Sequence, residues 1–508
     1  MSARNSWLVS LAAVLLLHVA DLWPAERAAL PTLSGPIANT PTSHPFGAAA
    51  HQNVPLDLDA LGYVEEEYFI RGVARVFDWG ETASPVVLGR GSYTTRILLR
   101  RPRDPQRFNG TVIVEPLNPS ADMDLPIMWA ESHEQWMAEG NAWVGVTIKP
   151  NTIGALKRFD GERYASLGFP NPRATAACQS ADINPLSGPT TTHDESGLAW
   201  DVLSQLGALL KSTKVLELLH RPALRLYMTG QSQSAGYART YASVFATTVA
   251  AAHGTPLYDA YLYSGSPPWQ VPLHQCRKDL DAKDSRLITP AVGVPVIELF
   301  AEGDIGTNIV TRRPDSDAAP DLFRRYELAG AAHVDPWEAR SFARDEDAKR
   351  AQGRAGTAAD PACVPADVVA SDFPVRYAFD AAWRNLDAWV REGTAPPRAE
   401  RLQLQSDVTP FDPTRAFVLD AHGNTKGGVR STYVDVPLAR YVGAKKGGFR
   451  CMFSGYKIGL EAAELQRLYP DRTTYLKKVR TRADELVVER WLTRADRDAL
   501  VREAERYH

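Results

Sequence analysis

The sequence predicts an α/β protein built on a doubly wound, mostly parallel β-sheet. Apolar, β-rich runs alternate with helical patterns between residues 64 and 333, which is the order expected when parallel strands are joined by crossover helices. One run breaks at a stretch of Gly, Gln and Ser at residues 230–234 and passes directly into a helix-forming segment. Two connections are longer than a crossover requires, which indicates insertions at the carboxyl edge of the sheet.

The expected strands begin with an antiparallel pair and continue with five shorter runs. They are residues 64–76, 93–101, 111–115, 142–148, 224–229, 258–264 and 294–300. Asp194 is a candidate N-cap for a helix that ends near Lys211, and the next helix is expected to begin at Ala235. The positive N-terminal end of this second helix would face an anion held at the preceding turn.

The stretch Gly230-Gln-Ser-Gln-Ser234 has the form of a nucleophile elbow. In such an elbow a central Ser occupies a strained turn between strand and helix, and small residues lie two positions away on either side. Gly230 and Ser234 take these positions, although the usual pattern ends in Gly. The pattern predicts Ser232 as a catalytic nucleophile, with an ordinary strand-to-helix turn as the alternative.

A Ser nucleophile on this kind of sheet needs an acid and a His, which follow it along the chain in that order. The β-rich run 294–301 ends in Glu302-Gly-Asp304, where Asp304 is the favoured acid and Glu302 the alternative. A later short strand and several small residues lead to His333. Of the eleven His residues, His333 alone has this order and context, and a structural role is its alternative.

Acyl transfer also requires N–H donors for the oxyanion of the tetrahedral intermediate. The backbone N–H of Gln233, directly after the nucleophile, is the first expected donor. The second is expected from the loop that follows the strand at 111–115, where Leu117 and Asn118 are the candidates. Pro119 has no N–H and restricts the residue before it to extended geometry. A simple Pro-punctuated loop is the alternative.

These motifs resemble those of a family of bacterial α/β-hydrolase-domain proteins that are mostly exported and carry a Gly-x-Ser-Gln-Ser elbow. The similar segments are Gly110–Asn118 (GTVIVEPLN), Val144–Thr147 (VGVT), Tyr164–Leu167 (YASL), Gly230–Ala235 (GQSQSA), Ala329–His333 (AGAAH), Trp389–Pro397 (WVREGTAPP) and His422–Arg430 (HGNTKGGVR). The resemblance runs from about Leu61 to the C-terminus. It implies the α/β-hydrolase fold, with Ser232 as nucleophile and His333 as base. It implies no substrate, because one fold serves many functions.

The predicted domain organisation has three parts. Residues 1–30 are expected to be a signal peptide or an N-terminal anchor, and residues 55–390 a catalytic domain. Insertions are expected within this domain at about 151–193 and 265–293. Residues 391–508 are expected to form a C-terminal extension that packs on the core.

Aromatic residues in the two insertions are candidates for a substrate pocket. Tyr164 lies in the first insertion and Trp269 in the second. Because insertions at the carboxyl edge of such a sheet build lids and pockets, both are expected to line the acyl or alcohol site. Aromatic residues in loops also serve as packing anchors, which is the alternative.

The N-terminus has the pattern of an export signal. Met1–Arg4 carries a positive charge, and the apolar run Trp7–Ala20 is too short for an ordinary transmembrane helix. An uncleaved anchor is the alternative, and no stable membrane span is expected in the mature chain. His44 and His51 follow in a Pro-rich leader and are not expected to act as the catalytic base.

Export would place the four Cys residues in an oxidising compartment, where they can form two disulfides. Their wide spacing excludes the paired-Cys pattern of a zinc or redox site. We expect Cys178 to pair with Cys276, which would join the two insertions. Cys363 is expected to pair with Cys451 and anchor the extension. The two other connectivities remain open.

Composition and motifs exclude several classes of function. The net charge of −3 gives no footprint for nucleic acid, and the chain has no Gly-rich phosphate loop, dinucleotide fingerprint or His-Glu-x-x-His motif. No metal or cofactor is expected. The sequence therefore predicts an exported serine hydrolase that cleaves small-molecule or polymer carboxylic esters through an acyl-enzyme. An acyltransferase or amidase with the same triad and a non-catalytic binding module are the alternatives.

Overall fold

A computed structural model describes most of the chain. The described residues are 26–81, 84–173, 183–184, 188–189, 193–276, 280–281, 284–353, 362–405, 412 and 416–506. The apolar leader and Cys178 lie outside them, and so does the expected pairing of Cys178 with Cys276. Among the described residues, no helix combines the length and the apolar character needed to cross a membrane.

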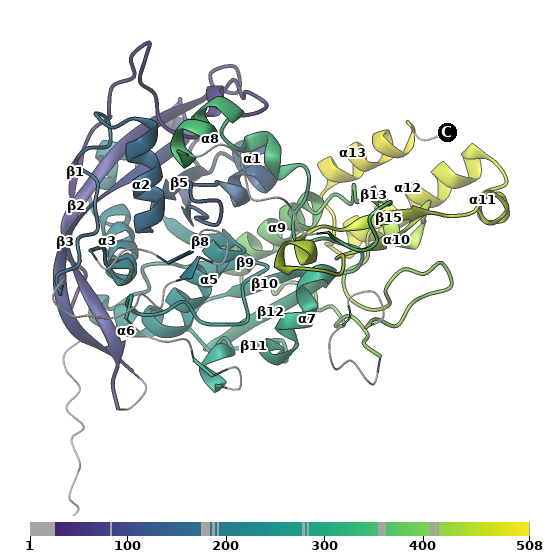
Figure 1. Cartoon of the computed structure of the whole chain (residues 1–508). Helices are drawn as coiled ribbons and strands as arrows, with labels where there is room; N and C mark the ends of the chain where they lie inside the picture. Colours follow the sequence, from purple (N-terminus) through teal and green to yellow (C-terminus); the bar gives the residue numbers. More distant parts are fainter. Residues whose placement is uncertain are drawn as a thin grey trace, which may run out of the picture.

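A ten-stranded sheet forms the centre of the molecule (Figure 1). In sheet order its strands are β1 (Thr32–Ser34), β2 (Tyr63–Trp79), β3 (Pro85–Pro102), β5 (Ala142–Val146), β4 (Thr111–Pro116), β8 (Arg225–Gln231), β9 (Ala260–Ser264), β10 (Val296–Ala301), β12 (Asp321–Leu328) and β11 (Ser316–Ala318). The six strands from β5 to β12 run parallel. The remaining pairs are antiparallel. This topology confirms the predicted doubly wound, mostly parallel sheet.

Alternate side chains of each central strand are buried on opposite faces of the sheet. On β4, Val112 and Val114 belong to one apolar core while Ile113 belongs to the other. This division follows from the two-residue period of a strand, and it explains why the central strands read as continuous apolar runs. Because both faces are apolar, both must be covered by helices.

The helices cover the two faces in separate groups. The described helices are α1 (Ile127–Glu139), α2 (Pro150–Phe159), α3 (Ala199–Lys211), α4 (Val215–Leu219), α5 (Gln233–Thr240), α6 (Ala246–His253), α7 (Ile305–Asn308), α8 (Asp345–Gln352), α9 (Arg376–Glu392), α10 (Thr432–Asp435), α11 (Ala462–Leu468), α12 (Arg472–Val488) and α13 (Arg494–Ala504). Side chains of α2, α3 and α5 join the core on one face. Side chains of α1 and α9 join the core on the other.

The N-terminal segment from residue 26 onward packs on the sheet. Its short strand β1 pairs with β2. Phe46 is buried in the core, and its backbone N–H donates to the Tyr164 hydroxyl at 2.9 Å. The backbone N–H of Ala28 donates to His253 Nε2 at 2.9 Å. This segment is therefore part of the same core as the central strands.

The C-terminal residues form an extension with a small core of its own. A three-stranded sheet joins β13 (Val369–Ala370), β15 (Tyr456–Gly459) and β14 (Ala439–Val442). α12 and α13 contribute Val479, Leu486 and Leu500 to a third apolar cluster. These helices lie at the end of the molecule opposite to β2 and β3 (Figure 1). The extension reaches the central sheet through a bridge between Leu328 and Val429.

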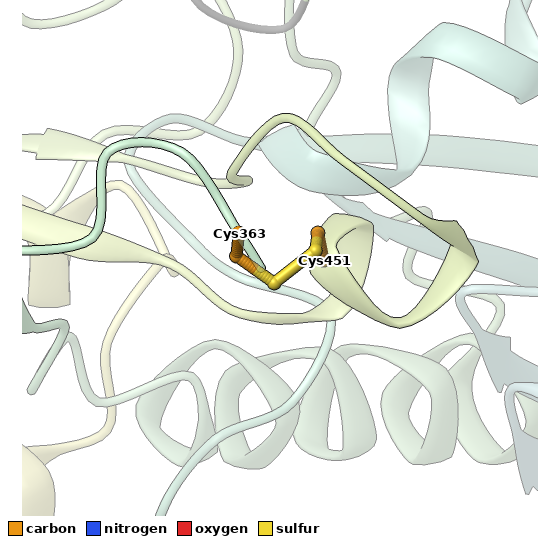
Figure 2. The surroundings of a disulfide bond; sticks show 2 residues. All are labelled: Cys363 and Cys451. Carbon is orange, nitrogen blue, oxygen red and sulfur yellow. A yellow bond between two sulfur atoms is a disulfide. The ribbon is translucent and has the colours of Figure 1, made fainter. Parts of the chain in front are cut away.

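A disulfide joins Cys363 to Cys451, which is the expected pairing (Figure 2). The two residues are 88 positions apart in the sequence. The bond fastens the turn of the extension around Cys451 to the chain that follows α8. Among the described residues there is no free thiol.

Removal of this disulfide in a Cys363→Ala, Cys451→Ala double variant is expected to lower stability by about 2–4 kcal/mol, since closing a long loop restricts the unfolded chain. The measurement is the free energy of unfolding in urea. Oxidised wild-type protein is the control, and both proteins are measured without reductant so that the expected pair of Cys178 and Cys276 is the same in each. Equal unfolding midpoints for the variant and the oxidised wild type would contradict the prediction.

Candidate active site

Ser232 lies at the junction of β8 and α5, as the elbow pattern predicts. Its backbone has φ 56° and ψ −123°, a conformation that costs a residue with a side chain on the order of 1–3 kcal/mol. The turn is held by two hydrogen bonds: the Ser232 N–H donates to the Ser264 carbonyl at 2.9 Å, and the Gly236 N–H donates to the Ser232 carbonyl at 3.1 Å. The sheet and the helix together impose the strained conformation.

The small residues of the elbow have different physical roles. A Cβ on Gly230 would lie 2.6 Å from the backbone of Ser234, so this position accepts only Gly. The buried Ser234 hydroxyl accepts a hydrogen bond from the Gln231 N–H at 3.0 Å and donates to the Gln231 carbonyl at 2.9 Å. The departure from a final Gly therefore adds a side-chain link that closes the turn.

Replacement of Ser234 with Ala is expected to lower the free energy of unfolding by about 1–3 kcal/mol, because the Gln231 N–H loses its acceptor in a buried site. Urea denaturation measures this loss. Ser266→Ala is the matched control, since the buried Ser266 hydroxyl has no hydrogen-bond partner among the described residues. We expect this control to be neutral or stabilising. Equal losses in the two variants would contradict the assigned role of Ser234.

His333 and Asp304 meet Ser232 at the carboxyl edge of the sheet. Asp304 follows β10 and His333 follows β12. His333 Nε2 lies 2.9 Å from Ser232 Oγ, and His333 Nδ1 lies 2.5 Å from Asp304 Oδ1. Asp304 Oδ2 accepts a hydrogen bond from the Ala301 N–H at 2.9 Å. The His and Asp side chains are only 8% and 7% exposed. This geometry directs the Nδ1 proton toward the carboxylate and leaves Nε2 to accept a proton from the serine.

Glu302, the alternative acid, is turned away from His333. Its buried carboxylate accepts hydrogen bonds from the Gly330 N–H at 2.8 Å and the Gly443 N–H at 3.1 Å. Burial raises the pKa of this carboxyl above its ordinary value. The two carboxylates therefore have different tasks, since Asp304 holds the His and Glu302 ties the end of β10 to the extension.

The backbone N–H groups that were expected as the second oxyanion donor form hydrogen bonds with other carbonyls. The Leu117 N–H donates to the Val146 carbonyl at 2.9 Å, and the Asn118 N–H donates to the Leu125 carbonyl at 2.9 Å. The expectation for these two amides is therefore wrong, because the loop after β4 folds back on itself and uses both N–H groups. The Asn118 side chain instead donates to the Gln231 carbonyl at 2.7 Å, which supports the elbow. Gln233 begins α5, where the first N–H groups have no acceptor within the helix.

Three residues that the sequence analysis did not single out position the His. Gly265 has φ 57°, and a Cβ there would lie 3.0 Å from the His333 ring. The Gln231 side-chain amide donates to the His333 carbonyl at 2.9 Å. The Phe453 ring packs on the imidazole with a centroid separation of 4.6 Å. Gly265 follows a predicted strand directly, which is a weak signal for a tight turn, whereas nothing local marks Phe453.

A cavity of about 460 Å³ opens beside Ser232. Its lining includes apolar side chains from distant parts of the chain, among them Ile127, Trp269, Phe342 and Phe453. Trp269 therefore lies where it was expected. Tyr164 does not, because it is fully buried elsewhere and donates its hydroxyl to Glu67 at 2.8 Å. Its packing role corrects the prediction of a pocket residue.

Comparison with known proteins identifies the family of this chain. A family model described as an alpha/beta hydrolase domain matches residues 33–502. The chain belongs to this alpha/beta hydrolase family. The search of curated proteins found no match to this alpha/beta hydrolase.

Solved structures similar to this alpha/beta hydrolase include several esterases and hydrolases. A dienelactone hydrolase from Anabaena variabilis has 15% identity and a TM-score of 0.27, with 56% of this chain and 94% of that chain covered. A variant of esterase rPPE has 12% identity and a TM-score of 0.31, with coverage of 60% and 84%. A CE15 glucuronoyl esterase from Teredinibacter turnerae has 13% identity and a TM-score of 0.29, with coverage of 64% and 80%.

Proposed function

We propose that this alpha/beta hydrolase is an exported serine hydrolase that cleaves carboxylic esters through Ser232, His333 and Asp304. The observation that carries the proposal is the continuous chain of contacts from Ser232 Oγ to His333 Nε2 at 2.9 Å and from His333 Nδ1 to Asp304 Oδ1 at 2.5 Å. A nucleophile, a base and an orienting acid within hydrogen-bond reach form the minimum machinery of acyl transfer.

The proposed reaction passes through an acyl-enzyme. His333 takes the Ser232 proton as Oγ attacks the ester carbonyl, and Asp304 stabilises the imidazolium that forms. The Gln233 N–H and the positive end of α5 stabilise the oxyanion. His333 then returns the proton to the departing alcohol. A water molecule then gives a proton to the same His and attacks the acyl-enzyme, and His333 passes this proton to Ser232 Oγ as the carboxylic acid leaves.

The cavity supports a substrate with an apolar acyl or alcohol group. Trp269, Phe342 and Phe453 contribute to its walls, and its volume of about 460 Å³ is in the range of small-molecule sites. Polymer chains carrying such an ester are included in the proposal. The disulfide between Cys363 and Cys451 supports export, because disulfides persist in oxidising compartments.

The test is covalent labelling with a fluorophosphonate, followed by peptide mass spectrometry to locate the adduct. We expect one adduct at Ser232 in the wild type and no rapid labelling in His333→Ala. Ser234→Ala is the matched control, since it removes a neighbouring hydroxyl and should still be labelled at Ser232. A folded wild-type protein without an adduct would refute the proposal and favour a binding module.

A second experiment separates ester hydrolysis from its alternatives. Matched ester and amide substrates are incubated with unmodified enzyme from a preparation that reacts with the fluorophosphonate. The reactions are run with and without added alcohols, and the products are quantified. Free acid as the main product from esters supports the proposal. Preferential cleavage of amides would favour an amidase, and a dominant transfer product would favour an acyltransferase.

A further inference from the structure

Two His residues of the N-terminal segment face a buried carboxylate on α8, apart from the proposed catalytic residues. The His44 and His51 rings are stacked with their centroids 3.5 Å apart. His44 Nε2 lies 3.7 Å from Asp347 Oδ2, and His51 Nδ1 lies 3.8 Å from the same oxygen. We propose that His44, His51 and Asp347 bind a divalent transition-metal ion, with Zn²⁺ as the probe.

The carboxylate of Asp347 is the strongest indication of a cation-binding site. The side chain is fully buried, yet neither oxygen has a hydrogen-bond partner among the described residues. The buried Nδ1 of His51 has no hydrogen-bond partner in the described part of the chain either. Buried polar groups are normally satisfied, and a buried charge normally has a close partner or a metal ion. Three potential ligand atoms within 4.8 Å of one another surround the position where such an ion would lie.

The orientation of His44 supports this assignment. Its Nδ1 lies 3.1 Å from the Pro45 carbonyl, to which it donates as an N–H. This bond leaves the lone pair of Nε2 on the side of Asp347. A carbonyl bonded to the second ring nitrogen is the arrangement that orients most metal-binding imidazoles.

Binding requires only local adjustment. Tetrahedral zinc with bonds of about 2.0–2.1 Å places neighbouring ligand atoms about 3.4 Å apart, so the two His nitrogens would each move a few tenths of an ångström toward Asp347. The stacked rings would also splay so that their lone pairs converge. Side-chain exposure of 14% for His44 and 29% for His51 gives an ion access from solvent.

Arg344 is the group that competes with a cation. Its Nε lies 3.3 Å from Asp347 Oδ2, but this nitrogen makes no hydrogen bond among the described residues. The Arg344 side chain is 43% exposed, so it can turn toward solvent when an ion enters. Glu65 is the other charged group that acts on His51, and its carboxylate is held by Arg100 at 2.8 Å.

The position of the site indicates a structural role. The backbone N–H of Arg344 donates to the His51 carbonyl at 3.0 Å, and Gln52 forms a β-bridge with Ala343. Phe342, directly before this bridge, lines the catalytic cavity. An ion at this site would fasten the segment that follows His333 to the N-terminal segment. No step of the proposed hydrolysis passes through it.

The test is a Zn²⁺ titration of the purified full chain after chelator treatment, against a competing chromophoric chelator. We expect one Zn²⁺ per chain and a rise in Tm on binding. Asp347→Asn and His51→Gln should each weaken the affinity by more than about 100-fold, which exceeds the usual effect of residues around a metal's ligands. Arg344→Gln should tighten binding several-fold, because it removes the competing cation.

His422→Gln is the matched control, because His422 also pairs with a carboxylate, that of Glu464 at 2.8 Å, and should bind no ion. Circular dichroism verifies that each variant is folded. If Asp347→Asn or His51→Gln is not folded, the affinity of His44→Gln is measured in its place. Wild-type protein that takes up no Zn²⁺, or Asp347→Asn with wild-type affinity, would overturn the proposal. Loss of binding in His333→Ala would instead place the ion at the catalytic residues and would also overturn it. Fluorophosphonate labelling of Ser232 tests the proposed function independently.

Discussion

Ser232→Ala is expected to lower kcat for an activated ester by about 10⁴- to 10⁶-fold, the range seen when the nucleophile of a serine hydrolase is removed. Without Oγ, no acyl-enzyme forms, and His333 has no hydroxyl to deprotonate. The cavity and the Gln233 N–H remain, so substrate binding should change little. Single-turnover kinetics with a chromogenic ester measures the effect, and the initial burst of alcohol should disappear.

The fold of the Ser232→Ala variant should survive, because the backbone bonds of the elbow do not use Oγ. Urea denaturation should place its free energy of unfolding within about 1 kcal/mol of the wild type. Ser266→Ala, which removes another hydroxyl from the cavity wall, should keep near-wild-type turnover and is the matched control. Wild-type rates in Ser232→Ala would refute the assignment of the nucleophile.

Asp304→Asn is expected to lower kcat by about 10⁴-fold while the geometry is retained. The amide cannot stabilise the imidazolium, and its NH₂ group favours a tautomer with the proton on Nε2. That proton would face Ser232 Oγ, where a free lone pair is needed. Steady-state kinetics with the same ester measures the loss.

Glu302→Gln separates the two carboxylates of this loop. It removes one acceptor from the Gly330 and Gly443 N–H groups, so we expect a stability loss of about 1–3 kcal/mol. The kcat of the folded protein should fall by less than about 10-fold, since Glu302 does not contact His333. A larger kcat loss in Glu302→Gln than in Asp304→Asn would reverse the assignment of the acid.

Much of the fold could be predicted because its signals are local. Apolar strand runs, the strained Ser between β8 and α5, and the chain order of acid and His follow from short patterns and from the topology of parallel sheets. The sheet confirms the expected strand sequence, including the antiparallel opening of β2 and β3. The sequence favours Asp304 but leaves Glu302 open as the alternative acid, because the choice depends on which partners each carboxylate meets in space.

The expected oxyanion donors and the expected pocket residue Tyr164 also depend on contacts that the local sequence does not reveal. Leu117 and Asn118 occupy the right loop, but a bridge to Leu125 uses the second amide. Tyr164 lies in a predicted insertion, yet its hydroxyl satisfies Glu67 within the core. In each case the residue type was suitable, and long-range pairing decided its role.

Short sequence patterns are sufficient to predict the parallel sheet, the elbow at Ser232, the position of His333 and two candidate acids, because strand period, turn chemistry and chain order can be read from the chain directly. The three-dimensional packing establishes that Asp304 holds the His, that Phe453 of the extension packs on it, and that His44 and His51 meet Asp347. These contacts join segments that are far apart in the chain. Their formation depends on how apolar faces pack and on which buried polar groups find partners, which no local pattern encodes.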